Sequence, residues 1–511
     1  MRRKLSGMLI LPLLALPAAA SAQEEEQEES EGALPRLGQA PGEPLAPSAS
    51  PSSAFGTPPA ESKGNVLDFH GYMLLPLRIG VMERPDPRPG QAATTLHVPP
   101  LTPDERRSFG YTGVLPDPWI QLNFSYGNRT VAATAILGAT GATDGTGFYN
   151  PVQQLGVYDA FISVNLEDAF ELPFEVKVGA LTSRYGAMGA YDAGRYGTPL
   201  MFRTNSVGET ITASFDLGDA ALVIEQGFGG QISRPEYNMV PAPWNDFAGT
   251  NSGSTNVTTG ASFVNQLHGG IGFNNLVQLG LHYATAWSQD DQGPSGLIPD
   301  GRLSVYGLDA RLTAGRFGHL YAGLAQTNAT NAESVSGVIE ILNARGGPEL
   351  MDRYLGLDSG GDGSLTTFGA QYDMSLARAV YDRDFEGRSS DVLFSLFGMG
   401  TQVSSDDPEA DGVLKLKGGI QATYNLYSWF SVSGRFDHVR LDSSSDRLAY
   451  HVISPALLFH TDWQSRDEFA LQYSHYIYGA LVNVRRGLPP IEDPTAVPDR
   501  NVLMLSGTFW W

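Results

Sequence analysis

The stretch LKLKGGIQATYNLYSWFSVSGRFDH, residues 414–438, consists of two alternating segments joined by a short Leu-Tyr-Ser connection. In the first segment, apolar side chains such as Leu416 and Ile420 alternate with polar ones such as Lys417 and Gln421. The second segment, WFSVSGRFDH, repeats the same order. This alternation predicts two β-strands, each with one apolar and one polar face, joined as a hairpin.

Similar segments recur along the chain and predict eighteen strands, with sixteen as the nearest alternative. The first is VLDFHGYMLLPLRIG, which begins near residue 66. The others lie near 119–126, 129–138, 155–167, 172–181, 206–217, 219–228, 263–273, 275–285, 302–314, 317–327, 365–376, 390–401, 413–425, 427–439, 450–461, 467–478 and 500–511.

The connections between these segments alternate in length. Short turns are expected at Gly127-Asn128, Gly218-Asp219, Asn274-Asn275, Gly315-Arg316, Leu426–Ser428 and Asp462–Arg466. Long connections are expected at 82–118, 139–154, 182–205, 229–262, 286–301, 328–364, 402–412, 440–449 and 479–499. Short turns on one rim and long loops on the other are typical of a transmembrane antiparallel β-barrel of the outer membrane. The segment 377–389 does not fit, because it should be a short turn and is too long.

Composition supports the same fold class. The chain has 511 residues, 42% hydrophobic content, 59 glycines and no cysteine, and it lacks the long uninterrupted apolar run of a transmembrane helix. A membrane protein of this kind must satisfy its backbone hydrogen bonds between strands of a barrel. The aromatic stretch NVLMLSGTFWW, residues 501–511, predicts a strand that places aromatic side chains at a membrane interface. A soluble two-sheet sandwich is the alternative fold, but it does not require the alternation of turn lengths.

Three parts of the chain are expected. Residues 1–22 have a basic start, a short apolar run and an Ala-Ser-Ala cleavage site, which together indicate a secretory signal peptide. Residues 23–63 begin with an acidic run and continue in Pro, Ala, Ser and Gly, which predicts a disordered periplasmic linker. Residues 64–511 are expected to form the barrel.

Two terminal motifs resemble the maltoporin family of carbohydrate-selective outer-membrane channels. They are the FHGY stretch at residues 69–72 and the paired tryptophans Trp510-Trp511. The resemblance implies an eighteen-stranded barrel that assembles as a homotrimer, with a row of aromatic side chains along the lumen. It also places VKVGALTSRYG, residues 176–186, on the strand that leads into a constriction loop.

The third long connection, residues 182–205, is the expected constriction loop. It combines arginine and aromatic side chains, which can hydrogen-bond sugar hydroxyls and cover the apolar faces of sugar rings. The candidate solute-binding residues are Arg184, Tyr185, Tyr191, Asp192, Arg195, Tyr196, Phe202 and Arg203. An ordinary extracellular loop rich in glycine and tyrosine remains the alternative.

The parity of each predicted strand places further side chains in the lumen. The candidates are Tyr72, Arg78, Trp119, Phe161, Lys177, Asp309, Arg311, Lys415, Lys417, Arg435, Asp437 and Trp510, with Glu175 and Glu225 as additional inward charges. The charges have both signs, and only five lysines occur in the chain. A phosphate-selective pore is therefore disfavoured, and the net charge of −22 favours cations or neutral solutes and disfavours nucleic acid as a partner.

Other sites have weaker signals. No two of the nine histidines have the spacing of a zinc helix or finger. The glycine-rich loop 356–364 lacks the pattern of a calcium-binding hand. No nucleophile signature is found, so neither an enzyme nor a cofactor is expected. The segment 332–347 has helical apolar spacing at Val335, Val338, Ile339 and Leu342, and we expect a helix that caps the channel mouth.

The sequence therefore predicts a porin in the outer membrane of a Gram-negative bacterium. It would passively conduct small hydrophilic solutes, with oligosaccharides as the leading class and ions among the solutes. A general diffusion pore, a barrel enzyme and an envelope adhesin are the alternatives. Its expected partners are outer-membrane lipid, lipopolysaccharide and the barrel-assembly machinery, which would engage the aromatic C-terminal strand.

Overall fold

The computed structural model describes residues 64–81, 119–140, 154–187, 199–232, 261–274, 276–289, 301–330, 339–341, 362–381, 390–405, 411–440, 442–446, 449–460, 468–479 and 500–510. All of them belong to a compact unit that spans Arg36–Trp511. The predicted signal peptide and linker, residues 1–63, lie outside the described residues.

The described residues are almost entirely β-strand. The strands are β1 (Val66–Gly80), β2 (Trp119–Gly127), β3 (Val131–Thr140), β4 (Gln154–Asn165), β5 (Phe174–Ala187), β6 (Pro199–Asp216), β7 (Ala220–Ile232), β8 (Ala261–Phe273), β9 (Val277–Gln289), β10 (Arg302–Thr313), β11 (His319–Thr330), β12 (Ile339–Ile341), β13 (Gly363–Ser375), β14 (Asp391–Ser404), β15 (Leu414–Tyr427), β16 (Phe430–Arg440), β17 (Ala449–His460), β18 (Glu468–Tyr478) and β19 (Arg500–Trp510). Two short α-helices, α1 (Leu166–Phe170) and α3 (Leu376–Tyr381), and the 3-10 turn η5 (Gly315–Phe317) join strands.

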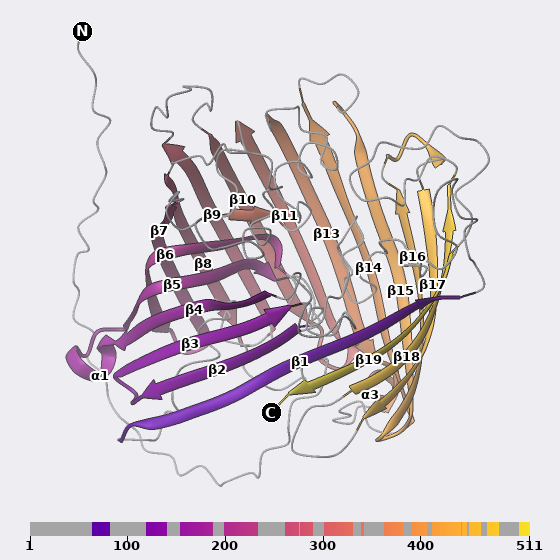
Figure 1. The fold of residues 1–511 in the computed structure, drawn as a ribbon, viewed down its shortest axis with the longest axis horizontal. Coiled ribbons are helices and arrows are strands. Elements are labelled where there is room, and N and C mark those ends of the chain that lie inside the picture. Colours follow the sequence, from indigo (N-terminus) through magenta and orange to yellow (C-terminus); the bar gives the residue numbers. More distant parts are fainter. Residues whose placement is uncertain are drawn as a thin grey trace, which may run out of the picture. The chain divides into compact units, whose positions relative to one another are not determined.

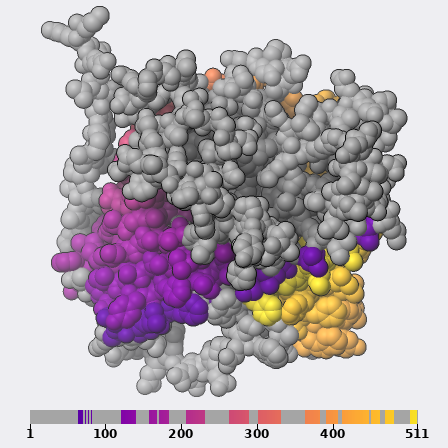
Figure 2. All heavy atoms as spheres, viewed as in Figure 1, coloured from indigo at the N-terminus to yellow at the C-terminus, as the bar shows by residue number. Residues whose placement is uncertain are grey.

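Eighteen of these strands pair antiparallel with their neighbours in chain order, and β12, with three residues, is the nineteenth member of the sheet. The first strand, β1, pairs with β2 on one edge and with β19 on the other. The register places Leu77 opposite Leu505 and Gly80 opposite Val502. The last strand, β19, therefore pairs with the first strand, β1 (Figure 1). The indigo atoms of β1 lie beside the yellow atoms of β19 in Figure 2.

Exposure alternates along the strands, as the sequence pattern predicts. On β15, Ile420 and Tyr424 are exposed, whereas Lys417 and Thr423 are buried. On β19, Leu505 is exposed and Ser506 is buried. In a barrel, the exposed apolar side chains face outward and the buried polar side chains face inward.

Aromatic side chains gather on the outer face at both ends of the strands. Near the short turns, they form contacting pairs with ring centroids 4.9–5.6 Å apart: Phe69–Phe124, Tyr427–Trp429, Phe430–Phe459 and Phe469–Phe509. Toward the long connections, Phe228, Phe263 and Trp287 form a second cluster. Two aromatic girdles around an apolar band are the pattern of a protein that spans an outer membrane.

These features make the chain a transmembrane β-barrel of the Gram-negative outer-membrane type. Its outer face carries large exposed side chains such as Leu281, Leu396 and Val207, which water would not solvate well. Its inner face is polar. The sixteen-strand alternative and the soluble sandwich are wrong.

No helix among the described residues is both long enough and apolar enough to cross a membrane.

Five of the six predicted short turns overlap connections between consecutive strands, and the sixth, Asp462–Arg466, lies outside the described residues. Positive φ angles occur at Gly218 (82°), Asn274 (44°) and Gly315 (58°), which are glycine or asparagine because these residues tolerate the left-handed region. The Asn128 side chain accepts hydrogen bonds from the backbone N–H groups of Thr130 and Val131. Side-chain hydrogen bonds of this kind stabilise a turn locally.

The segment 377–389, which did not fit the sequence scheme, begins within helix α3. Asp391 holds this helix, because one carboxylate oxygen accepts from the backbone N–H of Ala377 (2.9 Å) and the other accepts from the Ser375 hydroxyl (2.6 Å). The connection is therefore long because it contains a helical turn. Residues 382–389 lie outside the described residues.

Two sequence predictions are wrong at the rim of the long connections. Residues 182–187 and 199–205, predicted as loop, continue β5 and β6 as paired strands. The helix predicted over 332–347 is replaced at 339–341 by strand β12, which pairs with Phe202–Thr204 of β6. Alternating Ile-Glu-Ile suits an edge strand, and it pairs with β6 beyond Val207, where the described pairing of β6 with β7 begins. Val335, Val338 and Leu342 lie outside the described residues.

Because the two faces of β15 meet different surroundings, substitution by arginine should have a large effect on the outer face and a small effect on the inner face. Ile420 lies near the middle of the strand on the outer face, and Gln421 lies beside it on the inner face. We expect Ile420→Arg to lower the free energy of unfolding in lipid vesicles by about 2–4 kcal/mol, because the charge enters hydrocarbon. Gln421→Arg should change it by less than about 1 kcal/mol. Urea unfolding measures both, and equal effects would contradict the face assignment.

Candidate channel lumen

Polar side chains from strands all around the barrel line its inner face. Those buried on it include Gln121, Asn123, Ser125, Thr210, Glu225, Gln266, Thr367, Gln371, Thr423, Ser433, Ser454, Ser506 and Thr508. Such groups need hydrogen-bond partners, which a water-filled channel and neighbouring strands both supply. The inner face is therefore suited to contact with water and hydrophilic solutes.

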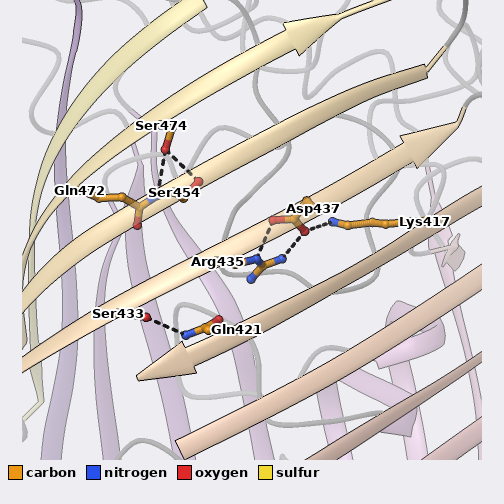
Figure 3. Close-up of polar contacts among 8 residues, drawn as sticks. All are labelled: Lys417, Gln421, Ser433, Arg435, Asp437, Ser454, Gln472 and Ser474. Atoms are coloured by element: carbon orange, nitrogen blue, oxygen red, sulfur yellow. Dashed lines mark hydrogen bonds and ion pairs between the residues drawn. The ribbon is translucent and has the colours of Figure 1, made fainter. Parts of the chain in front are cut away.

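A charged cluster lies on the inner faces of β15 and β16 (Figure 3). The Arg435 guanidinium donates to both carboxylate oxygens of Asp437, from Nε (2.7 Å) and from a terminal nitrogen (2.8 Å). Lys417 Nζ lies 3.7 Å from Asp437. Two cations thus share one carboxylate, and the cluster has a net positive charge.

An aromatic ring supports this cluster from β14. Phe397 lies with its ring centroid 4.9 Å from Arg435 Cζ and 5.9 Å from Lys417 Nζ, distances at which cation–π attraction operates. A Cβ at Gly419 would overlap the ring atom Cζ of Phe397. Glycine is therefore required at position 419 for the ring to lie against the wall.

Hydroxyl and amide side chains form chains of hydrogen bonds beside the charged cluster. Gln472 donates to Ser474 (3.1 Å), and the Ser474 hydroxyl donates to Ser454 (3.1 Å). Gln421 donates to Ser433 at 3.5 Å (Figure 3). These groups present both donors and acceptors along the wall, as binding of hydroxylated or hydrated solutes requires.

A second charged region lies on the other side of the strand order. Lys177 Nζ is 3.3 Å from Glu175 on β5 and 5.8 Å from the centroid of the Phe161 ring on β4. The register then continues from Glu175 to Thr212 and from Thr212 to Glu225, and Thr212 donates to Glu225 at 3.2 Å. This part of the wall contains more carboxylates than cations.

A third inward group lies on β10 and β11 near a short turn. The Arg311 guanidinium carbon is 5.5 Å from the ring centroid of Tyr321, and a terminal nitrogen of Arg311 is 3.4 Å from His319 Nδ1. Arg311 Nε has no hydrogen-bond partner within the described residues. This nitrogen is buried, so a hydrogen-bond partner for it has to come from a water molecule or from a residue outside the described ranges.

Eight of the predicted lumen residues have described side chains, and all eight lie on the inner face. They are Phe161, Lys177, Asp309, Arg311, Lys415, Lys417, Arg435 and Asp437. Tyr72, Arg78, Trp119 and Trp510 lie in β1, β2 and β19, but their side chains lie outside the described part of the structure. The contacts bring together Lys417, Arg435 and Asp437, and separately Phe161 and Lys177.

The structure leaves the predicted constriction site untested. Arg184 and Tyr185 lie on β5 directly opposite Arg203 and Phe202 on β6, so these four backbones belong to one hairpin, although their side chains are not described. Tyr191, Asp192, Arg195 and Tyr196 lie outside the described residues. Because β12 adds to the same hairpin at Phe202–Thr204, segments from two long connections meet there.

Sequence reasoning missed a histidine pair on the inner faces of β8 and β9. His268 and His282 lie directly opposite one another in register, and their Nδ1 atoms are 2.8 Å apart. The predicted two-residue turn at Asn274-Asn275 would place His268 opposite Leu281. In the structure, Phe273 pairs with Val277, so the connection is one residue longer and His268 lies opposite His282. The pair therefore depends on a register shift of one residue, which the sequence did not predict.

No protein-family model matches the chain, and no curated protein matches it. Among solved structures, OccK11 (OpdR) of Pseudomonas aeruginosa is 11% identical over 88% of this chain and 96% of its own, with a TM-score of 0.41. OprD of the same organism is 10% identical over 88% and 97%, with a TM-score of 0.40. OmpT, an outer membrane protein of Vibrio cholerae, is 10% identical in its trimer form over 88% and 99%, with a TM-score of 0.37.

These identities and TM-scores are too low to assign a family, a solute or an oligomeric state. The barrel is therefore assigned from the chain's own strand pairings and faces. No maltoporin is among these three structures, so the maltoporin resemblance stays a prediction.

The shared carboxylate of the charged cluster allows a test of its effect on ions. We expect Asp437→Asn to raise the permeability of chloride relative to potassium by about twofold or more, because Lys417 and Arg435 would lose their counter-charge at the lumen wall. Reversal potentials across a planar bilayer in a KCl gradient measure this ratio.

Asp446→Asn is the matched control, because it removes the same charge from an exposed carboxylate beside Arg440. Arg440 follows the outward parity of β16, so this control should leave the permeability ratio within experimental error. An equal shift in the two variants would show that Asp437 does not act on the conduction path.

Proposed function

We propose that the chain is a passive outer-membrane channel for small hydrophilic solutes, with oligosaccharides as the leading solute class. The observation that carries this proposal is the charged and hydroxylated inner face of an eighteen-stranded barrel. Side chains on this face offer many separate donors and acceptors, so a solute can exchange partners as it moves. The driving force is the concentration gradient alone, and the protein acts as a non-enzymatic pore.

The sugar-binding part of the proposal concerns the hairpin of β5 and β6 and the connection between them. Arg184, Tyr185, Tyr191, Asp192, Arg195, Tyr196, Phe202 and Arg203 would form the constriction. Their mixture of aromatic and hydrogen-bonding groups suits pyranose rings. The meeting of β12 with β6 supports a narrowed entrance at this position.

A general diffusion pore is the second candidate, and one observation favours it. Tyr450 and Tyr476 are at most 5% exposed on the described inner face, so they offer little surface to a sugar. Three other rings on that face, Phe161, Phe397 and Tyr321, each have a cationic side chain over them. These cations compete with a sugar ring for the aromatic face. Oligosaccharide selectivity therefore depends on the aromatic side chains of the constriction.

The remaining parts of the proposal follow from the sequence. Residues 1–22 would direct export and be removed, and residues 23–63 would remain as a periplasmic linker. The aromatic strand β19 would engage the barrel-assembly machinery, and lipopolysaccharide would contact the outer face. A homotrimer is implied by the maltoporin resemblance.

Planar-bilayer recording tests the channel and the sugar separately. We expect purified protein to give stepwise conductance increases, and maltohexaose to reduce the open-channel current in a concentration-dependent manner. The double variant Tyr185→Ala/Tyr196→Ala should weaken the apparent sugar affinity by at least about tenfold, because burial of apolar surface between a tyrosine ring and a sugar contributes on the order of 1 kcal/mol or more per ring. If no sugar tested reduces the current, the protein is a general diffusion pore and not a sugar-selective channel.

The matched control replaces two tyrosines on the outer face, Tyr283→Ala/Tyr306→Ala, whose rings contact one another at 5.2 Å. This variant should keep the wild-type sugar affinity. Absence of any conductance from correctly folded wild-type protein would contradict the channel function itself, whatever the effect of sugars.

A further inference from the structure

Three inward side chains on consecutive strands form a hydrogen-bonded line. Asp309 on β10 contacts His282 on β9 at 2.6 Å, from Oδ1 to Nε2. His282 Nδ1 then lies 2.8 Å from Nδ1 of His268 on β8. All three residues are at most 8% exposed, and they lie on the polar inner face. The two imidazole rings are nearly parallel, with an interplanar angle of 13° and ring centroids 4.5 Å apart.

The carboxylate fixes the arrangement of hydrogens in this line. An ionised Asp309 only accepts hydrogen bonds, so the Nε2 atom of His282 must carry the hydrogen that it donates. In the neutral ring, the Nδ1 atom of His282 therefore carries a lone pair, which is directed at His268. A carboxylate that holds the far nitrogen of an imidazole is the usual outer support of a metal-ligating histidine.

The backbone is adapted to this contact. Gly280 faces Asp309 directly in the register of β9 and β10, and a Cβ at this position would overlap Asp309 Oδ1 and lie 2.8 Å from His282 Nε2. Glycine therefore leaves the space in which the carboxylate reaches the histidine. On the other side, Glu225 of β7 lies opposite His268, so a second carboxylate adds negative potential near the pair.

We propose that His268 and His282 bind one borderline divalent cation, such as Zn²⁺, between their Nδ1 atoms at the wall of the lumen. Such ions prefer imidazole nitrogen at about 2.0–2.1 Å. To bind one ion at tetrahedral spacing, the two Nδ1 atoms need to separate by about 0.5 Å, and the two nearly parallel rings need to turn so that both lone pairs meet the ion. Both rings would bind the ion as neutral imidazoles with the hydrogen on Nε2. A proton on Nδ1 of either ring would be exchanged through solvent for one on Nε2, so the charge of the ring does not change.

The site uses two protein ligands, and water completes the coordination. No group of three or more His, Asp or Glu side chains converges on one point within the described residues. An incompletely enclosed ion in a channel binds reversibly and adds positive charge to the carboxylate-rich part of the wall. Zinc would therefore lower cation conductance while it is bound.

A second histidine pair provides the contrast. His438 and His451 on β16 and β17 also face one another through Nδ1 atoms, at 3.0 Å, but they follow the outward parity of their strands. Here Arg440 Nε donates to His438 Nε2 at 3.1 Å. His438 must then carry its hydrogen on Nδ1, and the guanidinium repels a cation. This pair has a similar spacing without the features that favour a metal.

The direct test is calorimetric titration of untagged, full-length protein in detergent with ZnCl₂. We expect one Zn²⁺ per chain, and loss of that binding in His268→Gln/His282→Gln. Asp309→Asn should weaken it by about 10- to 100-fold, the effect that loss of an outer support typically has. The control variant His438→Gln/His451→Gln should bind zinc as the wild type does. Circular dichroism establishes that each variant is folded.

Two results would overturn the proposal. One is wild-type protein that binds no zinc in this titration, and the other is a folded His268→Gln/His282→Gln variant that binds zinc with wild-type affinity. Because the titration does not require conduction, its outcome is independent of the proposed channel function. Zinc block of the bilayer current is the second readout, and it should disappear in the same variant and on addition of EDTA.

Discussion

The whole structure depends on the pairing of β1 with β19. Inside a bilayer no water satisfies the backbone, and each unpaired N–H or C=O group costs several kcal/mol. Seventeen pairings between strands adjacent in the order could form along the chain and still leave two open edges in lipid. The eighteenth joins Tyr72–Gly80 to Val502–Trp510, which are more than 400 positions apart in the sequence numbering. This contact gives every long strand two neighbours.

That pairing also decides which side chains meet water. A slip of one residue would move every outward side chain of a strand to the inner face. Two structural features recur on the inner face. Side chains two residues apart on one strand contact each other, as in Arg435–Asp437 and Gln472–Ser474. Glycines opposite large groups leave space for them, as Gly419 does for Phe397 and Gly280 for Asp309.

Alternation and turn chemistry were sufficient to predict all eighteen long strands, because both are local properties of the sequence. They also placed Lys417, Arg435 and Asp437 on one face. They could not predict β12, because its pairing with β6 joins segments from two different connections. They also missed the extension of β5 and β6 over residues 182–187 and 199–205. The contact of Phe397 with Arg435 was missed because it depends on register across three strands and on the glycine at position 419. The pair of His268 and His282 was missed because the connection between β8 and β9 is one residue longer than the predicted turn, which shifts the register.

Cysteine cross-linking tests the central claim most directly, because the natural chain contains no cysteine. Leu77 and Leu505 are opposite one another and both exposed on the outer face. Directly opposed residues have Cβ atoms about 4.5–5.5 Å apart, close enough for a disulfide after small adjustment. Leu77→Cys/Leu505→Cys should form one on mild oxidation in folded protein. Leu77→Cys/Leu471→Cys, two strand spacings apart through the pairing of Leu471 with Leu505, should not. Failure of the first pair, or equal cross-linking of both, would contradict the paired β1 and β19.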